Sequence, residues 1–327
     1  GHIRMATDTI HTVMPLEVDI PRGRLVAVTG VSGSGKTTLV LETLIPALKA
    51  QAAGECLPGH VRWVDAEGIA RANLIDATPI GANVRSTVAT YADIHDELRR
   101  AFARTPEAKA AGYKAGAFSY NTGALRCPTC DGTGSISLDV QFLPGVEIVC
   151  PACRGSRYAE AASHIHREGK DGSLLTLPQL MDMSVDEAID ATVGLKKVQA
   201  RLQTLHDLGL GYLTLGEPTP ALSGGEAQRL KLASEMGRVQ DDAVFVFDEP
   251  TIGLHPLDVQ VLLSVFDGLV AKGATVIVIE HDLDLIRNAD YVIDMGPGGG
   301  DAGGQIVSAG TPDDIVACSK SITGRYL

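Results

Sequence analysis

The segment that most constrains the fold of this chain is Gly30-Val-Ser-Gly-Ser-Gly-Lys-Thr37, because it fits the pattern G-x-x-x-x-G-K-[ST]. A short apolar, β-branched run over 24–30 leads into it, and leucines at helical spacing follow over 37–50. In such a strand–loop–helix, glycines let backbone N–H groups surround phosphate oxygens, and the helix start adds a favourable dipole. The sequence therefore predicts an α/β fold with a site for a nucleotide phosphate.

This phosphate-binding loop, the P-loop, assigns roles to single side chains. Lys36 is expected to reach the β- and γ-phosphates of ATP, and the Thr37 hydroxyl is expected to ligate Mg²⁺. The other residues expected to line the phosphates are Gly30, Ser32, Gly33, Ser34, Gly35 and Thr38. The alternative is a glycine turn that matches by chance, and the strand before the loop and the helix after it disfavour that alternative.

Two further runs, 242–250 and 273–282, are short and continuously apolar, which is typical of parallel strands covered on both faces. The segment between them has helical character and closes at Gly273. Asp248 and Glu249 stand at the end of the first run. We expect Asp248 to hold the magnesium through water and Glu249 to act as the general base for the attacking water.

The segment LSGGEAQR, residues 222–229, is called the signature segment here and is a second candidate for anion binding. Ser223, Gly224 and Gly225 precede a helix expected to begin near Glu226, and such a helix start can bind a phosphate. Because one nucleotide needs only one P-loop, these three residues are expected to cap a nucleotide held by another ATPase unit. A simple helix cap is the alternative.

Together, Lys36, the signature segment, DEP at 248–250 and His281 in IEHD resemble the ABC-type ATPases, whose two cores hold two ATP molecules head to tail. The resemblance implies a second ABC core, supplied by the same protein or by another copy. It also implies that His281 is the switch histidine at the γ-phosphate, so that Lys36, Glu249 and His281 form the catalytic set. For a histidine considered alone, a core or surface role is the more common one.

Four of the six cysteines form two close pairs, Cys127-x₂-Cys130 and Cys150-x₂-Cys153. Two such knuckles fit a tetrahedral zinc site that closes a hairpin-like loop, and the run SISLDVQF between them alternates like a strand. A closed shell of four thiolates leaves no open coordination position, so the zinc would be structural. A redox-active pair of dithiols is the alternative.

The net charge of −12 argues against nucleic acid wrapped over most of the surface, so any contact with DNA is expected to be local. The candidate basic residues, for which an ordinary solvated mixture of charges is the alternative, are Arg126, Arg154, Arg157, Lys196, Lys197 and Arg201. The chain has no apolar run of about 18 residues and no signal-peptide pattern, so a cytoplasmic location without a membrane is expected. The first residues, GHIR, resemble an appended leader ahead of Met5 and are expected to lie outside the fold.

An ABC-type ATPase with a zinc module resembles the UvrA family of bacterial nucleotide excision repair, and specifically the C-terminal half of its members. The resemblance covers nearly the whole chain and includes VTGVSGSGKTTL, FSYNTGALRCPTCDGTG, FLPGVEIVCPACRGSRY, LSGGEAQRLKLASE and DEPTIGLH. It implies ATP hydrolysis coupled to the binding of damaged double-stranded DNA, and a zinc-bearing region that helps to engage the DNA. It also suggests UvrB as a further partner.

The sequence departs from the UvrA family at one position of the nucleotide site. Where the family has DQSPIG, this chain has DATPIG, so Ala77 replaces the glutamine that lines the magnesium and the attacking water. An alanine cannot orient water, so hydrolysis is expected to be slower or supported differently. Three alternatives stay open: a UvrA-like paralogue that gives resistance to DNA-binding drugs, an ATPase subunit of a transporter, and a module that only clamps nucleotide.

These features predict an ABC-type P-loop ATPase core with an inserted helical signature subdomain and a small zinc-binding module. We expect the first part of the core over 1–60, the DATPIG region and a linker over 61–120, the four-cysteine module over 121–160, the helical signature subdomain over 161–215, and the second part of the core over 216–327. Within the helical part, Ser184 and Glu187 predict a capping box.

Overall fold

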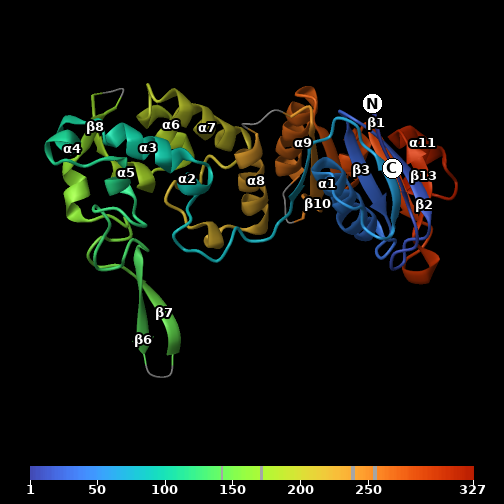
Figure 1. Ribbon diagram of the computed structural model, residues 1–327, viewed down its shortest axis with the longest axis horizontal. Coiled ribbons are helices and arrows are strands. Elements are labelled where there is room, and N and C mark those ends of the chain that lie inside the picture. Colours follow the sequence, from blue (N-terminus) through green and yellow to red (C-terminus); the bar gives the residue numbers. More distant parts are fainter. Residues whose placement is uncertain (141–142, 170–171, 237–239, 253–255) are drawn as a thin grey trace. The chain divides into compact units, whose positions relative to one another are not determined.

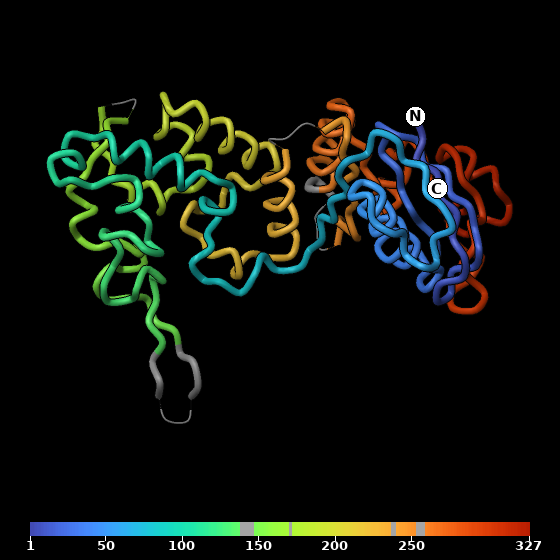
Figure 2. The backbone as a smooth tube through the Cα atoms, in the orientation of Figure 1, coloured from blue at the N-terminus to red at the C-terminus, as the bar shows by residue number. Residues whose placement is uncertain are grey.

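A computed structural model describes the chain over residues 1–140, 143–169, 172–236, 240–252 and 256–327 (Figure 1). The chain forms two compact units. The first unit combines Gly1–Ala77 with Met236–Leu327, and the second consists of Thr78–Glu235. The colours of Figure 2 show that the beginning and the end of the sequence build one unit, while the middle of the sequence builds the other.

A six-stranded sheet forms the centre of the first unit, in the order β13-β12-β3-β11-β10-β5. Neighbouring strands from β12 to β5 run parallel, and β13 pairs antiparallel at one edge. The strands are Leu25–Gly30 (β3), Arg71–Ile75 (β5), Ala243–Asp248 (β10), Thr275–Ile279 (β11), Tyr291–Gly296 (β12) and Gln305–Gly310 (β13). The parallel strands predicted from the three apolar runs are confirmed.

This sheet is covered on both faces, which explains why its strands are continuously apolar. Along β10, Val244 and Val246 join the core cluster that includes residues of η1 (Thr38–Leu44) and α1 (Ile45–Ala53). Phe247 points the other way, and its ring centroid lies 4.7 Å from that of Phe266 on α9, Pro256–Ala271. The remaining helices of the unit are α10 (Leu283–Asn288), η5 (Gly300–Ala302), α11 (Pro312–Ala317) and η6 (Thr323–Arg325).

A smaller antiparallel sheet, β2-β1-β4, completes the first unit. Its strands are β1 (His2–Thr7), β2 (Leu16–Pro21) and β4 (Val61–Asp65). The expectation that GHIR lies outside the fold is wrong. Ile3 and Met5 are fully buried, while the side chains of His2 and Arg4 contact Asp19 on β2. This alternation of apolar and polar side chains is what fits the segment to a sheet with one buried face.

The helix predicted over 37–50 is present but irregular. Its first part, η1, is a π-helix, and the Ile45 N–H donates to the Val40 carbonyl where η1 passes into α1. Pro46 stands at the start of α1 and has no N–H to donate to the Glu42 carbonyl, so a regular α-helix cannot run through this point. The spacing of the leucines predicts the helix but not this change of pitch.

The second unit is built mainly of helices. They are α2 (Val88–Tyr91), α3 (Ile94–Phe102), α4 (Pro106–Ala110), η2 (Ala115–Phe118), η3 (Glu160–His164), α5 (Leu177–Asp182), α6 (Val185–Ala191), α7 (Lys196–Asp207), η4 (Thr219–Ala221) and α8 (Gly224–Glu235). None of these helices, nor any other in the described part of the chain, combines the length and the apolar character needed to cross a lipid bilayer.

Two antiparallel hairpins accompany these helices. One pairs β6 (Ser135–Val140) with β7 (Leu143–Val149), and the other pairs β8 (His166–Glu168) with β9 (Leu174–Thr176). The β6–β7 hairpin extends away from the helices of its own unit (Figure 1). The strand predicted at SISLDVQF is therefore confirmed as β6, although the last two residues of that run lie outside the described residues.

The helical region predicted from residue 184 onward is confirmed as two helices, α6 and α7. They separate at Gly194, whose φ of 88° lies in the left-handed region that glycine adopts without strain. The predicted capping box at the start of α6 is also confirmed. The Ser184 N–H donates to Glu187 Oε2 at 2.8 Å, and the Glu187 N–H donates to Ser184 Oγ at 3.2 Å.

Candidate nucleotide site and metal centre

The P-loop lies at the carboxyl end of β3 in the first unit, and two of its glycines are required by close contacts. Gly30 has a φ of 130°, and a Cβ atom there would lie 2.0 Å from the Met295 carbonyl oxygen of β12. Gly35 has a φ of 95°, and a Cβ atom there would lie 2.7 Å from Val13 Cγ2. Only glycine fits both positions, so the loop is held tightly against its neighbours.

Lys36 is nearly buried within this loop. Its ammonium donates to the carbonyl oxygens of Gly30 and Val31, at 3.0 Å each. Burial lowers the pKa of Lys36, and nearby carboxylates, led by that of Glu249, act in the opposite direction. The positive charge is therefore placed between the loop and the carboxylates that follow the neighbouring strands.

Four hydroxyl side chains belong to the loop and the start of η1, namely those of Ser32, Ser34, Thr37 and Thr38. Ser34 Oγ is buried and forms no hydrogen bond within the described part of the chain. Such a hydroxyl is costly unless a ligand or water satisfies it, so it favours a polar ligand in the loop. Ser32 and Thr37 are exposed, whereas Thr38 Oγ1 donates to Glu42 Oε1 at 3.3 Å.

Asp248 ends β10, and Glu249 follows it at the same edge of the sheet as the P-loop. Glu249 has a φ of 46°, which is uncommon for a residue with a side chain, and its N–H donates to the Ile279 carbonyl at 2.9 Å. His281 follows β11, and its Nε2 lies 3.5 Å from Glu249 Oε1. The fold thus brings together two of the predicted catalytic residues. The last three residues of DEPTIGLH lie outside the described residues.

Carboxylates outnumber cations at this edge of the sheet. Burial raises the pKa of Asp248, and the carboxylates of Glu249, Asp76 and Glu280 raise it further, while Lys36 lowers it. A divalent cation would offset the repulsion between these carboxylates, and carboxylate and hydroxyl oxygens are the ligands that Mg²⁺ prefers. Thr37 and Asp248, the predicted ligands, lie at this edge.

Sequence reasoning does not single out two acidic residues of this edge, Asp76 and Glu280. Glu280 is buried, and its carboxylate accepts the N–H groups of Thr251 and His281 at 2.8 Å each, so it organises the turns that carry Glu249 and His281. Asp76 follows β5 and directly precedes the exposed Ala77. In the sequence, each was indicated by its neighbour, because Asp76 directly precedes Ala77 and Glu280 directly precedes His281.

A third acidic residue, Asp294, lies within β12 and is also missed. It is buried, accepts the Ser321 hydroxyl at 2.6 Å and the Thr323 hydroxyl at 3.0 Å, and acts on the charge of Lys36. A carboxylate inside the apolar run VIDMG was the only sequence signal for it. Its partners come from the segment SITGRYL, residues 321–327.

The signature segment lies in the second unit. Its helix, α8, begins at Gly224 and not near Glu226. Ser223 Oγ accepts the Glu226 N–H at 3.3 Å, and Glu226 Oε2 accepts the Ser223 N–H at 2.7 Å, which makes a helix cap. Ser223 and Gly224 are exposed, and Gly225 is half-buried beside them. The cap and an accessible helix start are therefore both present.

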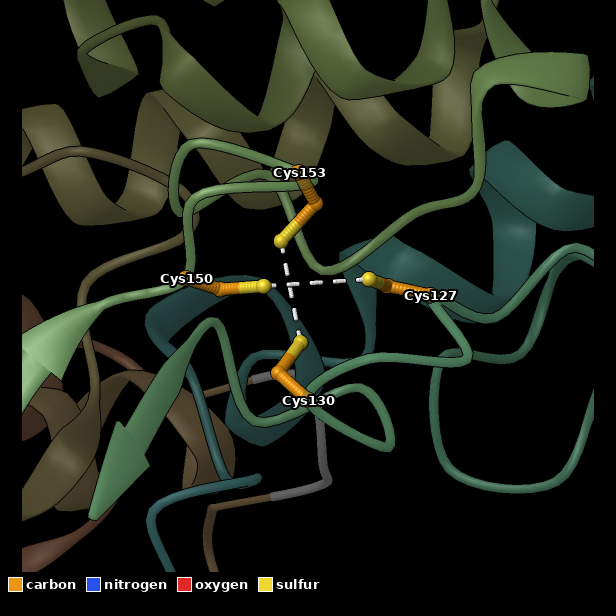
Figure 3. Close-up of side chains that lie close together, drawn as sticks. All are labelled: Cys127, Cys130, Cys150 and Cys153. Carbon is orange, nitrogen blue, oxygen red and sulfur yellow. Dashed lines mark hydrogen bonds between the residues drawn. The ribbon is translucent and has the colours of Figure 1, made fainter. Parts of the chain in front are cut away.

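The four paired cysteines converge on one point of the second unit (Figure 3). Their Sγ atoms all lie within 4.8 Å of one another, with Cys127 and Cys150 at 3.9 Å and Cys130 and Cys153 at 3.6 Å. Four sulfurs at about 2.3 Å from one zinc ion in a tetrahedron are about 3.8 Å apart, whereas disulfide sulfurs are about 2.0 Å apart. The cluster fits a four-thiolate zinc site.

The surroundings shift the pKa values of two of the cysteines in opposite directions. Burial opposes ionisation of Cys130, but the Gly134 N–H, which donates to its sulfur at 3.3 Å, and the neighbouring thiols lower its pKa to about 7. Burial raises the pKa of Cys153 to about 12, so a metal is needed to ionise it. The buried guanidinium of Arg157, which donates to the Val84 carbonyl at 2.9 Å, adds a positive charge beside both sulfurs.

Comparison with known proteins identifies relatives of the chain, although no family model matches it. UvrABC system protein A of Mycobacterium bovis is 45% identical over 320 residues, which are 97% of this chain and 32% of the relative. The protein of the same name from Aquifex aeolicus is 44% identical over 328 residues, which are 99% of this chain and 35% of the relative. The chain thus spans about a third of the length of the curated relatives it matches.

Two solved structures confirm the predicted fold class. UvrA2 from Deinococcus radiodurans superposes with a TM-score of 0.90 at 40% identity, over the whole of this chain and 39% of that one. An ATP-binding subunit of an ABC transporter superposes with a TM-score of 0.53 at 15% identity, over the whole of this chain and 98% of that one. The second likeness shows the fold alone, which is that of an ABC-type ATPase core.

Proposed function

Since this chain is homologous to about a third of UvrABC system protein A, we propose that it is a UvrA-like ATP-hydrolysing unit that couples its nucleotide state to DNA binding in nucleotide excision repair. The observation that carries the proposal is the carboxyl edge of the parallel sheet. There the P-loop lysine Lys36, Asp248, Glu249 and His281 follow the ends of β3, β10 and β11. These are the charges and hydrogen-bonding groups that hydrolysis of a triphosphate needs.

In the proposed reaction, the residues of the P-loop hold the triphosphate of ATP, and Lys36 balances the charge on its outer phosphates. Water attacks the γ-phosphorus, the bond to the bridging oxygen breaks, and ADP and phosphate leave. Glu249 takes the proton of the water, and His281 holds Glu249 and the γ-phosphate in place. Mg²⁺, held by Thr37 and Asp248, would supply the polarisation of the phosphoryl oxygens.

The proposal extends to the partners of the unit. Ser223, Gly224 and Gly225 would cap the nucleotide of a second ABC core, in the same protein or in another copy. Damaged double-stranded DNA is the proposed ligand of the assembly, UvrB a further partner, and the cytoplasm the place of action. Zinc, held by the four paired cysteines, would keep the β6–β7 hairpin in shape for this task, because a closed thiolate shell has no position for catalysis.

Ala77 is expected to affect the rate of ATP hydrolysis by this unit. Its methyl group can neither bind a magnesium ion nor orient a water molecule. The family resemblance would place a glutamine amide at this position, and without that amide Glu249 alone would act on the attacking water. We therefore infer that ATP hydrolysis is slow. The likeness to a transporter subunit is a likeness of fold only, and no observation favours transport.

The experiment that tests the proposed activity compares ATP turnover by the full-length protein with that of Glu249→Gln. Loss of the general base should lower kcat by about 10²- to 10⁴-fold, while the dissociation constant for ATP stays within about twofold. The matched control is Glu55→Gln, an exposed glutamate just after α1, which should turn over ATP like the wild type. Equal rates for wild type and Glu249→Gln would leave a module that only clamps nucleotide.

A further inference from the structure

A surface hollow of about 340 Å³ lies in the second unit, between α3 and the start of α7. These two helices lie side by side in the second unit (Figure 1). Four basic side chains line the hollow: Arg100 and Arg104 from α3 and the turn after it, and Lys196 and Lys197 from the first turn of α7. Glu97 is the one acidic residue in its lining.

The charges of this hollow are not balanced. Glu97 Oε1 accepts Arg100 Nη1 at 2.8 Å and lies 3.6 Å from Lys197 Nζ, so one carboxylate serves two cations. Arg104 and Lys196 are exposed and form no ion pair in the part of the chain that the structure describes. Four cations against one carboxylate leave a local charge of +3 (4 − 1) in a chain whose net charge is −12. An anion in the hollow would relieve this repulsion.

The lining indicates which kind of anion fits. Arginine side chains match the geometry of phosphate oxygens, and lysines add point charges to them. The rest of the lining is aliphatic, as at Ala101, Leu195 and Val198, and no aromatic ring is present among the lining residues to stack on a base. The hollow therefore suits a phosphate group whose base makes no contact with the protein better than it suits a free nucleotide. The phosphodiester backbone of DNA presents such phosphate groups.

The other basic residues predicted to approach DNA are mostly engaged elsewhere. Arg126 pairs with Asp131 at 2.9 Å, Arg157 is buried, and Arg201 donates to backbone carbonyls that include that of Asp93. Lys196 and Lys197, by contrast, are exposed and are joined in space by Arg100 and Arg104, which the sequence does not connect with them. Of the predicted set, the exposed members are therefore Arg154 and the two lysines of the hollow.

We propose that the hollow formed by Arg100, Arg104, Lys196 and Lys197 binds the sugar–phosphate backbone of duplex DNA without reading its sequence. This inference rests on the proposed function, because it takes DNA as the ligand. The contacts would position the second unit along the duplex, since phosphate contacts fix register and orientation but carry no base information.

The test measures the affinity of the full-length protein for a fluorescent duplex by anisotropy, between 50 and 200 mM salt. The double variant Arg104→Ala/Lys196→Ala removes two cations and leaves no acid unpaired. It should bind about tenfold or more weakly at 100 mM salt, and its plot of log K against log salt should be shallower by about 1 to 2. The loss should be equal for unrelated duplex sequences, and Arg104→Lys/Lys196→Arg should restore most of the slope.

The matched control is Lys49→Ala/Lys272→Ala, which removes two exposed cations from the first unit. It changes the net charge by the same amount, and it should leave the salt slope unchanged. If the wild type binds DNA and the hollow variant keeps its affinity and slope, the hollow does not bind DNA, although the proposed function stands. If the wild type binds no DNA in any nucleotide state, the proposed function fails and this inference fails with it.

A second measurement separates the backbone of DNA from a free anion. Inorganic phosphate is titrated into the wild type and into the Arg104→Ala/Lys196→Ala variant. We expect the wild type to need far more inorganic phosphate than DNA phosphate for half-saturation. Tight binding of inorganic phosphate that the variant loses, together with unchanged DNA affinity, would identify a free-anion site and overturn the proposal.

Discussion

At the scale of the residue, each unit contains a position where no additional atom or proton fits. The P-loop presses against the backbone of β12 at Gly30, and the second unit buries a neutral imidazole at His95. Both can be tested by single substitutions whose effects differ from those of a nearby control. The two tests use different properties, volume in one case and charge in the other.

Gly30→Ala should destabilise the first unit by roughly 3 kcal/mol or more, because its Cβ atom would lie 2.0 Å from the Met295 carbonyl oxygen. Gly54→Ala is the control, since Gly54 also has a positive φ, at 68°, but has nothing within 4 Å of the added atom. It should cost only about 1 kcal/mol. Urea unfolding followed by the fluorescence of Trp63, the single tryptophan, measures both. Similar losses in the free energy of unfolding for Gly30→Ala and Gly54→Ala would contradict the close contact between Gly30 and Met295.

His95 should make the stability of the second unit fall as the pH falls. Burial, with the charges of Arg99 and Arg157, lowers the pKa of His95 from 6.5 to about 3. In the unfolded chain this imidazole therefore binds a proton below about pH 6.5, whereas in the folded chain it binds one only below about pH 3. The free energy of unfolding is therefore highest above about pH 6.5, and it decreases as the pH falls from 6.5 toward 3. Between pH 7 and pH 5 the loss is about 2 kcal/mol.

The matched variant for this prediction is His95→Gln. His95 Nε2 lies 2.7 Å from the Tyr158 hydroxyl oxygen, and that hydroxyl donates to the Phe118 carbonyl at 2.9 Å, so the imidazole is the donor to Tyr158. A glutamine amide can donate in the same way and does not titrate. Urea titrations at pH 7 and pH 5 should show a smaller loss for the variant, by about 2 kcal/mol. Identical losses would mean that His95 is not held neutral.

At the scale of the element, the segment 78–90 connects two parts of the second unit. Arg85 Nη2 donates to Asp131 Oδ2 at 2.8 Å, and Arg157 Nη1 donates to the Val84 carbonyl at 2.9 Å, so both cysteine knuckles are tied to this segment. On its other side, the Thr219 N–H donates to the Ser86 carbonyl at 2.9 Å, a few residues before the signature segment. A single segment thus contacts the loops that carry the paired cysteines and also the chain that leads into α8.

Removal of the metal should therefore loosen the segment 78–90 as well as the knuckles. Without thiolates beside it, the buried charge of Arg157 loses its stabilisation, and its bond to Val84 weakens. Hydrogen exchange before and after chelation should show faster exchange over residues 84–90, with no change at β3 and β10 in the first unit. Metal analysis should first find about one zinc per chain. Unchanged exchange over 84–90 would show that the segment does not depend on the metal.

At the scale of the whole molecule, the fold class could be predicted because its signals are local. The P-loop stands between a strand and a helix, and the continuous apolar runs identify parallel strands. Both sequence signals arise within a short stretch of chain, the first from the hydrogen bonds that a loop offers to phosphate and the second from the burial of a strand on both faces. The roles of the P-loop, Asp248, Glu249 and His281 stay predictions, although the fold places Glu249 and His281 in contact.

What the sequence could not predict depends on contacts between distant segments. Asp294 meets Ser321 and Thr323 only because β12 lies beside the segment that follows α11. The basic hollow exists only because the turn after α3 approaches the start of α7. The strand β1 was missed because His2 and Arg4 look like part of a leader until their partner Asp19 is known. Pairings of this kind are not encoded in local spacing.

The measurement that tests the central claim most directly is the affinity for DNA as a function of nucleotide state. The full-length protein with Glu249→Gln, which should bind ATP but hydrolyse it slowly, is titrated against undamaged and damaged duplexes without nucleotide, with ATP and with ADP. If nucleotide state and DNA binding are coupled, the dissociation constant should differ between the ATP-bound and nucleotide-free states by about 5- to 150-fold. The same dissociation constant in all three states, for both duplexes, would contradict the coupling.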